Sequence, residues 1–336
     1  MPAGPGLLVI LGLGLPGCGP GSADERPGRP PASQGRLPGA GGISLHYEVV
    51  GEGADTLVVV HGGPGAGSKS VAPFLAPLAD DHTLVFYDQR GGGLSELPAD
   101  TTKLDATWFI EDLEAVRRHF GLERMKIVAH SFGALLAAEY AREHPDRIER
   151  MVFLGATGPS LREARAIARR SSTGGASADS AARRRVAELI RELLSGASDD
   201  PVDTCRAYER TAADLAPPGA REEPWPGTTC DYPSEAVRYS YHRTQRLTPR
   251  SLGAWDYTDA LREVEAPLLV IHGDADSLEL EPQRQWARAV PRGRLLIAGK
   301  GHKSGRADIV LPAIGTFMAG GWPAGATRVV PESEAP

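Results

Sequence analysis

Short apolar runs alternate with helical segments along most of this chain, and this alternation restricts the possible folds more than any other feature. Runs such as LVVVH (57–61) and TLVFYD (83–88) are typical of strands buried on both faces. Strands separated by helices predict an α/β fold, in which helices cover both faces of a parallel sheet. The expected strands are 43–50, 57–61, 83–88, 125–130, 151–156, 267–273 and 294–299, and the expected helices lie near 71–80, 107–121, 132–143, 282–290 and 304–318.

The alternation stops between about residue 159 and residue 255. This stretch is helical and irregular, rich in Arg at first and in Pro, Trp and Tyr later. Such an interruption predicts a helical cap (159–255) inserted into a core made of 43–158 and 256–320, with a C-terminal tail at 321–336. A chain of 336 residues, 41% of them hydrophobic, is long enough for one large domain with this insertion. The net charge of −6 and the lack of a basic domain argue against nucleic acid as a partner.

The N-terminal part has the features of an export signal followed by a linker. The apolar run GLLVILGLGL (6–15) has the length of a signal-peptide core and is too short to span a bilayer. Cys18 follows a small residue, which resembles a bacterial lipoprotein signal, although no Lys or Arg precedes the run and Pro16 is unusual there. We expect a signal peptide at 1–18, lipid anchoring through Cys18 at a membrane, and a flexible Pro/Gly-rich tether at 19–42. An ordinary secretion signal, giving a periplasmic protein, or a misassigned start, giving a cytoplasmic one, are the alternatives.

Two further cysteines, Cys205 and Cys230, lie 25 residues apart. In an exported protein such a pair can form a lasting disulfide. Closing that loop would stabilise the fold by about 3 kcal/mol in the chain-entropy model. Two free buried thiols are the alternative.

The segment KIVAHSFGALLAAEYA (126–141) places Ser131 between a predicted strand and a predicted helix. Ala129-His130-Ser131-Phe132-Gly133 matches the nucleophile elbow, usually written G-x-S-x-G, with Ala129 in place of the first glycine. The turn is so sharp that the positions two residues from the serine must be small. It also leaves Ser131 at a helix N-terminus, where backbone N–H groups can stabilise an anion. This pattern predicts that Ser131 is a nucleophile.

Two later strand ends offer the partners that a serine nucleophile needs. HGDAD (272–276) contains Asp274 and Asp276, and we favour Asp276 because it is the fourth residue of a G-x-x-D turn. GKGH (299–302) contains His302 just before the final predicted helix. The order serine, acid, histidine is the one that accompanies this elbow. His302 would take the proton from Ser131, and Asp276 would orient the imidazole.

Two glycine-rich motifs follow early strands. In HGGPG (61–65), an N–H from Gly62 or Gly63 would join the Phe132 N–H in an oxyanion hole. In DQRGGGLS (88–95), Asp88 and Arg90 would brace a turn.

Together, HGGPG, DQRGGGLS and the serine elbow resemble the proline iminopeptidase branch of the α/β-hydrolases over about residues 43–320. The resemblance implies an α/β-hydrolase fold, with a mostly parallel eight-stranded sheet, helices on both faces and an inserted helical cap. It also implies release of an N-terminal residue, often proline, from peptides or amides, and it implies no metal or organic cofactor. In that branch, cap carboxylates hold the free ammonium of the substrate, often within W-x-x-W-E. The nearest match is CRAYE (205–209), which lacks both tryptophans, so Glu209 is the first candidate anchor and Glu235 the second.

These features predict an exported serine hydrolase that forms an acyl-enzyme with a small peptide or amide. The missing cap tryptophans favour an alternative, an esterase or other small-molecule acyl hydrolase, and a solvated helix face would equally explain the two glutamates. An inactive surface protein that binds partners through its cap is a remote third hypothesis. No sequence feature indicates the oligomeric state.

Overall fold

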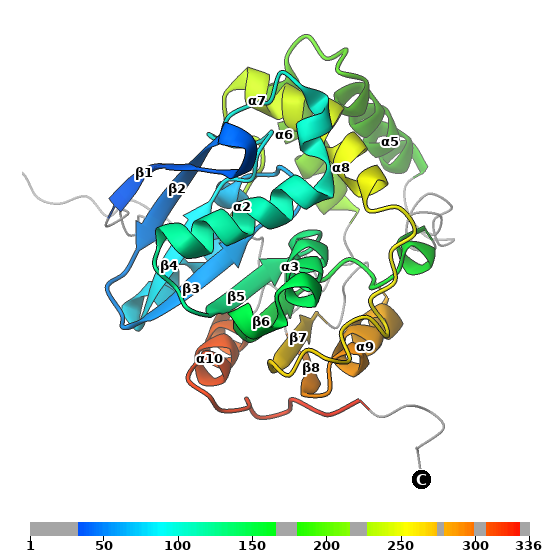
Figure 1. Ribbon diagram of the computed structural model, residues 1–336. Helices are drawn as coiled ribbons and strands as arrows, with labels where there is room; N and C mark the ends of the chain where they lie inside the picture. Colours follow the sequence, from blue (N-terminus) through cyan, green and yellow to red (C-terminus); the bar gives the residue numbers. More distant parts are fainter. Residues whose placement is uncertain (1–32, 166–179, 216–226, 274–278, 299–306, 330–336) are drawn as a thin grey trace, which may run out of the picture.

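A computed structural model of the chain describes residues 33–165, 180–215, 227–273, 279–298 and 307–329. The strands form one eight-stranded sheet in the order β1-β2-β4-β3-β5-β6-β7-β8, which confirms the predicted fold class (Figure 1). Strands β3 to β8 run parallel, and the pairs β1–β2 and β2–β4 are antiparallel. The strands are β1 Ser33–Pro38, β2 Ser44–Val50, β3 Asp55–Val60, β4 His82–Tyr87, β5 Met125–His130, β6 Ile148–Leu154, β7 Leu268–His272 and β8 Gly293–Ile297.

Helices cover both faces of the sheet. Alternate residues of β3 belong to different apolar clusters, because Val58 and Val60 pack with α2, α3 and α9, whereas Leu57 and Val59 pack with α1 and α10. Burial on both faces explains why the strand sequence is apolar without interruption. These helices are α1 Ala72–Leu75, extended by a 3₁₀ turn at Ala76–Asp80, α2 Ala106–His119, α3 Gly133–Glu143, α9 Leu280–Ala289 and α10 Ala307–Met318, and short 3₁₀ turns lie at Ala40–Gly42, Ser68–Ser70, Thr101–Leu104 and Pro145–Arg147.

Between β6 and β7 the described chain is mainly helical. Helices α5 to α8 gather at one end of the molecule, at the top of Figure 1. They have an apolar cluster of their own, which includes Leu193, Cys205, Cys230 and Tyr241. The helices are α5 Ser180–Ser195, α6 Pro201–Asp214, α7 Ser234–Tyr239, a π-helical turn at Ser240–Thr244, and α8 Gln245–Ser251.

The predicted tether at 19–42 is wrong from residue 33 onward, because β1 is the first strand of the sheet. All six residues of β1 pair with β2 in antiparallel register. The sequence SQGRLP is mostly polar, and Leu37 is the one residue of this strand that is buried. An edge strand with an exposed face is held by backbone hydrogen bonds that leave little trace in composition. The rest of the predicted tether, like the signal segment, lies outside the described residues.

The start of the C-terminal tail packs against the core. Leu295 of β8 and Thr327 exchange two backbone hydrogen bonds of 2.9 and 2.8 Å, and the Trp322 ring lies 5.0 Å from that of Phe317 in α10. Among the helices that the structure describes, none has both the length and the apolar character needed to cross a membrane.

Candidate active site

Ser131 lies at the junction of β5 and α3. Every residue of β5 is buried, and Ser131, which follows it, is half-buried. Its φ is 52°, and among the described residues it is the one non-glycine with a positive φ. A serine in this region is strained, and such strain concentrates at functional sites. The Ser131 N–H donates to the Leu154 carbonyl of β6 (3.0 Å) and its carbonyl accepts from the Ala134 N–H (3.1 Å), so hydrogen bonds hold both sides of the turn.

Small residues around the serine allow the turn to form. A Cβ atom on Gly133 would lie 2.3 Å from the Val60 carbonyl oxygen, a distance at which no side chain fits. Ala129 is fully buried between β3 and β6, where its single methyl group is tolerated. A Cβ atom on Gly62 would lie 2.9 Å from the Ser131 Cβ atom. The backbone of the HGGPG loop therefore runs directly against the serine.

The HGGPG and DQR motifs are joined by hydrogen bonds. The Gln89 N–H donates to His61 Nε2 (3.0 Å), the Gln89 amide donates to the His61 carbonyl (2.7 Å), and the Gly65 N–H donates to Gln89 Oε1 (3.0 Å). Because Nε2 accepts, the His61 proton lies on Nδ1, which is 2.9 Å from the Gly62 carbonyl oxygen. Burial lowers the pKa of His61, so its imidazole is neutral and acts as a structural bridge.

Asp88 is a fully buried carboxylate that connects three segments. Its Oδ1 accepts from the Ser68 N–H (2.6 Å) and the Tyr232 hydroxyl (3.2 Å), and its Oδ2 accepts from the Leu94 N–H (2.7 Å). Burial alone would raise its pKa, but the adjacent His46 and the backbone donors outweigh burial and bring the pKa to about 2. Asp88 therefore stays charged and braces the loops, as predicted from the sequence.

Arg90 is also fully buried and pairs with Asp112 of α2. Its Nε and Nη2 donate to the two Asp112 carboxylate oxygens, both at 2.6 Å, and further bonds reach the carbonyls of Lys103 and Ala40. These bonds fix the loop after β4 to α2.

The predicted acid and base follow β7 and β8 in the sequence. Asp274, Asp276 and His302 lie outside the described residues, as does Cys18. The strands that precede them, β7 and β8, run parallel to β5, so the chain leaves all three strands at the same edge of the sheet.

The predicted cap residues lie on α6 and α7. Glu209 accepts hydrogen bonds from the Thr228 hydroxyl (2.7 Å), the Thr229 hydroxyl (3.0 Å) and the Thr229 N–H (3.1 Å), using both carboxylate oxygens. Glu235 is exposed in the first turn of α7. Cys205 and Cys230 are joined in a disulfide. Their sulfurs and a Glu209 oxygen lie within 4.8 Å of one another, but sulfurs bonded in a disulfide are not available as thiolate metal ligands.

Hydrogen bonds between the cap and the core loops were not foreseen from the sequence. Besides Tyr232, the Ser240 hydroxyl donates to the Gly65 carbonyl (2.8 Å) and the Thr244 hydroxyl donates to the Gly91 carbonyl (2.7 Å). These contacts join positions more than 140 residues apart, and no local pattern indicates them.

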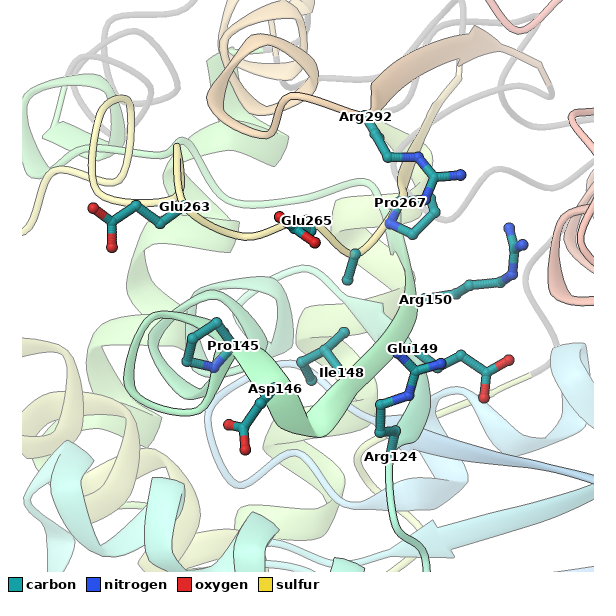
Figure 2. A pocket seen from close by; sticks show the side chains of 11 residues that line it. Arg124, Pro145, Asp146, Ile148, Glu149, Arg150, Glu263, Glu265, Pro267 and Arg292 are labelled. Atoms are coloured by element: carbon teal, nitrogen blue, oxygen red, sulfur yellow. The ribbon is translucent and has the colours of Figure 1, made fainter.

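A cavity of about 460 Å³ lies at the end of the parallel strands opposite to Ser131 (Figure 2). Arg124 precedes β5, Ile148 and Arg150 lie in the first half of β6, and Pro267 and Arg292 precede β7 and β8. The cavity therefore lies at the amino ends of the parallel strands. Ser131 follows the carboxyl end of β5, the edge at which ligands bind in α/β sheets, so this cavity does not belong to the serine site.

Comparison with known proteins defines the class. The family model described as alpha/beta hydrolase fold matches residues 55–304. The chain therefore belongs to the α/β-hydrolase fold family and is a hydrolase enzyme. Within the family, it resembles the proline iminopeptidase branch. A proline iminopeptidase of Lactobacillus helveticus (strain DPC 4571) is 29% identical over 263 residues, which cover 72% of this chain and 82% of that protein.

Other similarities are shorter or structural. A proline iminopeptidase of Heyndrickxia coagulans is 37% identical over 101 residues, which cover 30% of this chain and 35% of that protein. The crystal structure of proline iminopeptidase from Mycobacterium smegmatis has a TM-score of 0.59 and 23% identity, covering 85% of this chain and 98% of that one. The esterase RhEst1 from Rhodococcus sp. ECU1013 has a TM-score of 0.58 and 23% identity, covering 86% of this chain and 99% of that one. The two structures show the shared fold alone.

Proposed function

We propose that this protein is a serine hydrolase that acts through an acyl-enzyme, with Ser131 as nucleophile, His302 as base and Asp276 as the residue that orients the imidazole. The observation that supports this most is the strained φ of 52° at Ser131, directly after a buried central strand. The closeness of Gly62 to Ser131 supports an oxyanion hole made by the Phe132 N–H and an N–H of Gly62 or Gly63.

The reaction has two acyl-transfer steps. Ser131 Oγ attacks the substrate carbonyl carbon while His302 takes the hydroxyl proton, and the oxyanion accepts hydrogen bonds from the backbone donors. His302 then gives the proton to the leaving amine or alcohol. A water molecule, deprotonated by His302, attacks the acyl-enzyme and frees Ser131. The value of kcat/KM should rise as His302 loses its proton near neutral pH, and a flat profile from about pH 5 to 9 would contradict a histidine base.

The substrate that we favour is a peptide or amide with a free N-terminal residue. The similarity to proline iminopeptidases supports it, with Glu209, or secondly Glu235, binding the substrate ammonium. One observation favours the esterase alternative: both Glu209 oxygens already accept hydrogen bonds from Thr228 and Thr229. To bind an ammonium, Glu209 would have to accept a further hydrogen bond or give up one that it accepts from Thr228 or Thr229.

The two substrate classes can be separated with the purified chain and a panel of aminoacyl arylamides and simple acyl esters. If Glu209 binds the ammonium, Glu209→Gln should lose arylamide activity selectively and keep ester activity. Glu188→Gln is the matched control, because Glu188 is an exposed cap glutamate paired with Arg185. Equal retention of both activities in Glu209→Gln would remove Glu209 from substrate binding, and a wild-type preference for esters would favour the alternative.

We also propose export and lipid attachment at Cys18. The apolar run at 6–15 and the residues before Cys18 support this. Expression in a bacterium fed with labelled fatty acid should label the wild-type chain and leave Cys18→Ala unlabelled, and an unlabelled wild-type chain would contradict the lipid anchor.

A further inference from the structure

One buried tyrosine of the cap, Tyr232, contacts residues 67–70, which closely follow the HGGPG loop. We propose that Tyr232 is a positioning residue, which holds residues 67–70 onto Asp88 and thereby fixes the loop that faces Ser131. This inference rests on the proposed function, since a positioned loop matters for catalysis only if Ser131 is the nucleophile.

The Tyr232 hydroxyl makes two hydrogen bonds at the end of the loop. It accepts from the Lys69 N–H (2.9 Å) and donates to Asp88 Oδ1 (3.2 Å), the same oxygen that accepts from the Ser68 N–H (2.6 Å). Tyr232 is 7% exposed and Asp88 is fully buried, so water cannot readily replace these bonds. Burial raises the pKa of Tyr232 well above its usual range, and the hydroxyl therefore keeps the proton that it donates.

The ring of Tyr232 and its neighbours pack closely on the same segment. A Cβ atom on Gly67 would lie 2.4 Å from the Tyr232 ring, and one on Gly227 would lie 2.4 Å from the Ser70 carbonyl oxygen. The Lys69 ammonium lies 5.0 Å from the ring centroid and donates to the Asp231 carbonyl (2.9 Å). Cys230, two residues before Tyr232, is tied to α6 by the disulfide, which anchors this part of the cap.

Contacts along the loop connect residues 67–70 to Ser131. The Gly65 N–H, in the last residue of HGGPG, donates to the Gln89 side chain, and the Ala66 N–H donates to the Gly62 carbonyl (3.3 Å). Gly62 lies against Ser131. Asp88 and Tyr232 hold residues 67–70, after the turn that contains Gly62 and Gly63. The Gln89 amide, which donates to the His61 carbonyl (2.7 Å), holds the chain before that turn.

The test uses Tyr232→Phe in the full chain, which removes the hydroxyl and keeps the ring. Tyr239→Phe is the matched control, because the Tyr239 hydroxyl also bonds the cap to the core, at the Pro98 carbonyl outside the HGGPG loop. Three quantities are compared with the wild type: amide hydrogen exchange in peptides covering 61–70, kcat and KM on the best substrate of the panel, and the affinity for phenylboronic acid.

In Tyr232→Phe we expect exchange in 61–70 to rise at least about tenfold, because the variant loses both hydrogen bonds of the hydroxyl. We also expect kcat and boronate affinity to fall about tenfold while KM stays within about twofold, because the oxyanion hole acts on the tetrahedral species. Tyr239→Phe should match the wild type in all three. Unchanged exchange in 61–70, or an equal rise in both variants, would overturn the positioning role whether or not the protein hydrolyses anything. Raised exchange with unchanged kcat would also overturn it, whereas a wild-type chain that neither reacts nor binds the boronate would refute the proposed function instead.

Discussion

The close approach of Gly62 to Ser131 gives a sharp prediction for Gly62→Ala. Gly62 does not have a positive φ, so alanine suits its backbone, and the only difficulty is space. The added Cβ atom would lie 2.9 Å from the Ser131 Cβ atom and 3.2 Å from the His130 carbonyl oxygen. Ordinary van der Waals contact begins at 3.4 Å, so the loop and the serine must separate by about 0.5 Å.

A shift of this size is small for the fold and large for catalysis. Overpacking by one methyl group costs about 1–3 kcal/mol of unfolding free energy, which a domain of this size can lose without unfolding. An oxyanion-hole donor displaced by about half an ångström loses part of a contribution that reaches 10²–10³ in kcat when the donor is removed, so we expect kcat to fall about 10- to 100-fold.

The assay compares kcat, KM and the melting temperature of Gly62→Ala with those of the wild type and of Gly315→Ala. Gly315 lies in α10, and a Cβ atom there would meet nothing within 4 Å, so this control should keep full activity. A Gly62→Ala enzyme that is folded and retains kcat within about twofold would refute the placement of this loop at the oxyanion. Loss of activity that only accompanies unfolding would refute it as well.

Three further predictions concern stability. Asp112→Asn leaves the buried Arg90 guanidinium without its charged partner and should lower the unfolding free energy in urea by about 3 kcal/mol, and a change below about 1 kcal/mol would contradict a structural role for this pair. Glu114 accepts hydrogen bonds from Arg117, Tyr140 and Arg118, and these bonds lower the pKa of its carboxyl from 4.5 to about 2. The lowered pKa contributes about 3 kcal/mol to the unfolding free energy. This contribution is present above pH 4.5 and is lost as the pH falls toward 2. Glu114→Gln should remove that part of the acid dependence, and an unchanged acid profile would count against it. Reduction of the Cys205–Cys230 disulfide should lower the unfolding free energy by about 3 kcal/mol, with no effect of reductant on a Cys205→Ser/Cys230→Ser variant; equal effects on both proteins would contradict the assignment.

The parts of the fold that local sequence determines were predictable. The apolar runs at 57–61 and 125–130 correspond to β3 and β5, because burial on both faces requires such runs. The elbow at Ser131 was predictable because only small residues fit beside it, as the contacts of Gly133 show. The edge strand β1 was not, since its polar sequence is held by pairing with β2.

The contacts between cap and core were not predictable either. The bond from Tyr232 to Asp88 joins residues 144 positions apart, and neither residue has a neighbour in the sequence that indicates the other. Glu209 could be selected from its place in CRAYE, but the donors that it meets come from Thr228 and Thr229, which reach it only through the folding of the cap. Such pairings depend on tertiary packing, which a local pattern does not contain.

The central claim is that the His302 imidazole meets the Ser131 hydroxyl in the folded protein. Its most direct test is mass spectrometry of the chain after exposure to a fluorophosphonate, which reacts with an activated serine. We predict a single adduct on the peptide that contains Ser131, formed about a hundredfold more slowly in His302→Ala. A wild-type Ser131 that stays unmodified, or that reacts as fast without the imidazole, would contradict the claim.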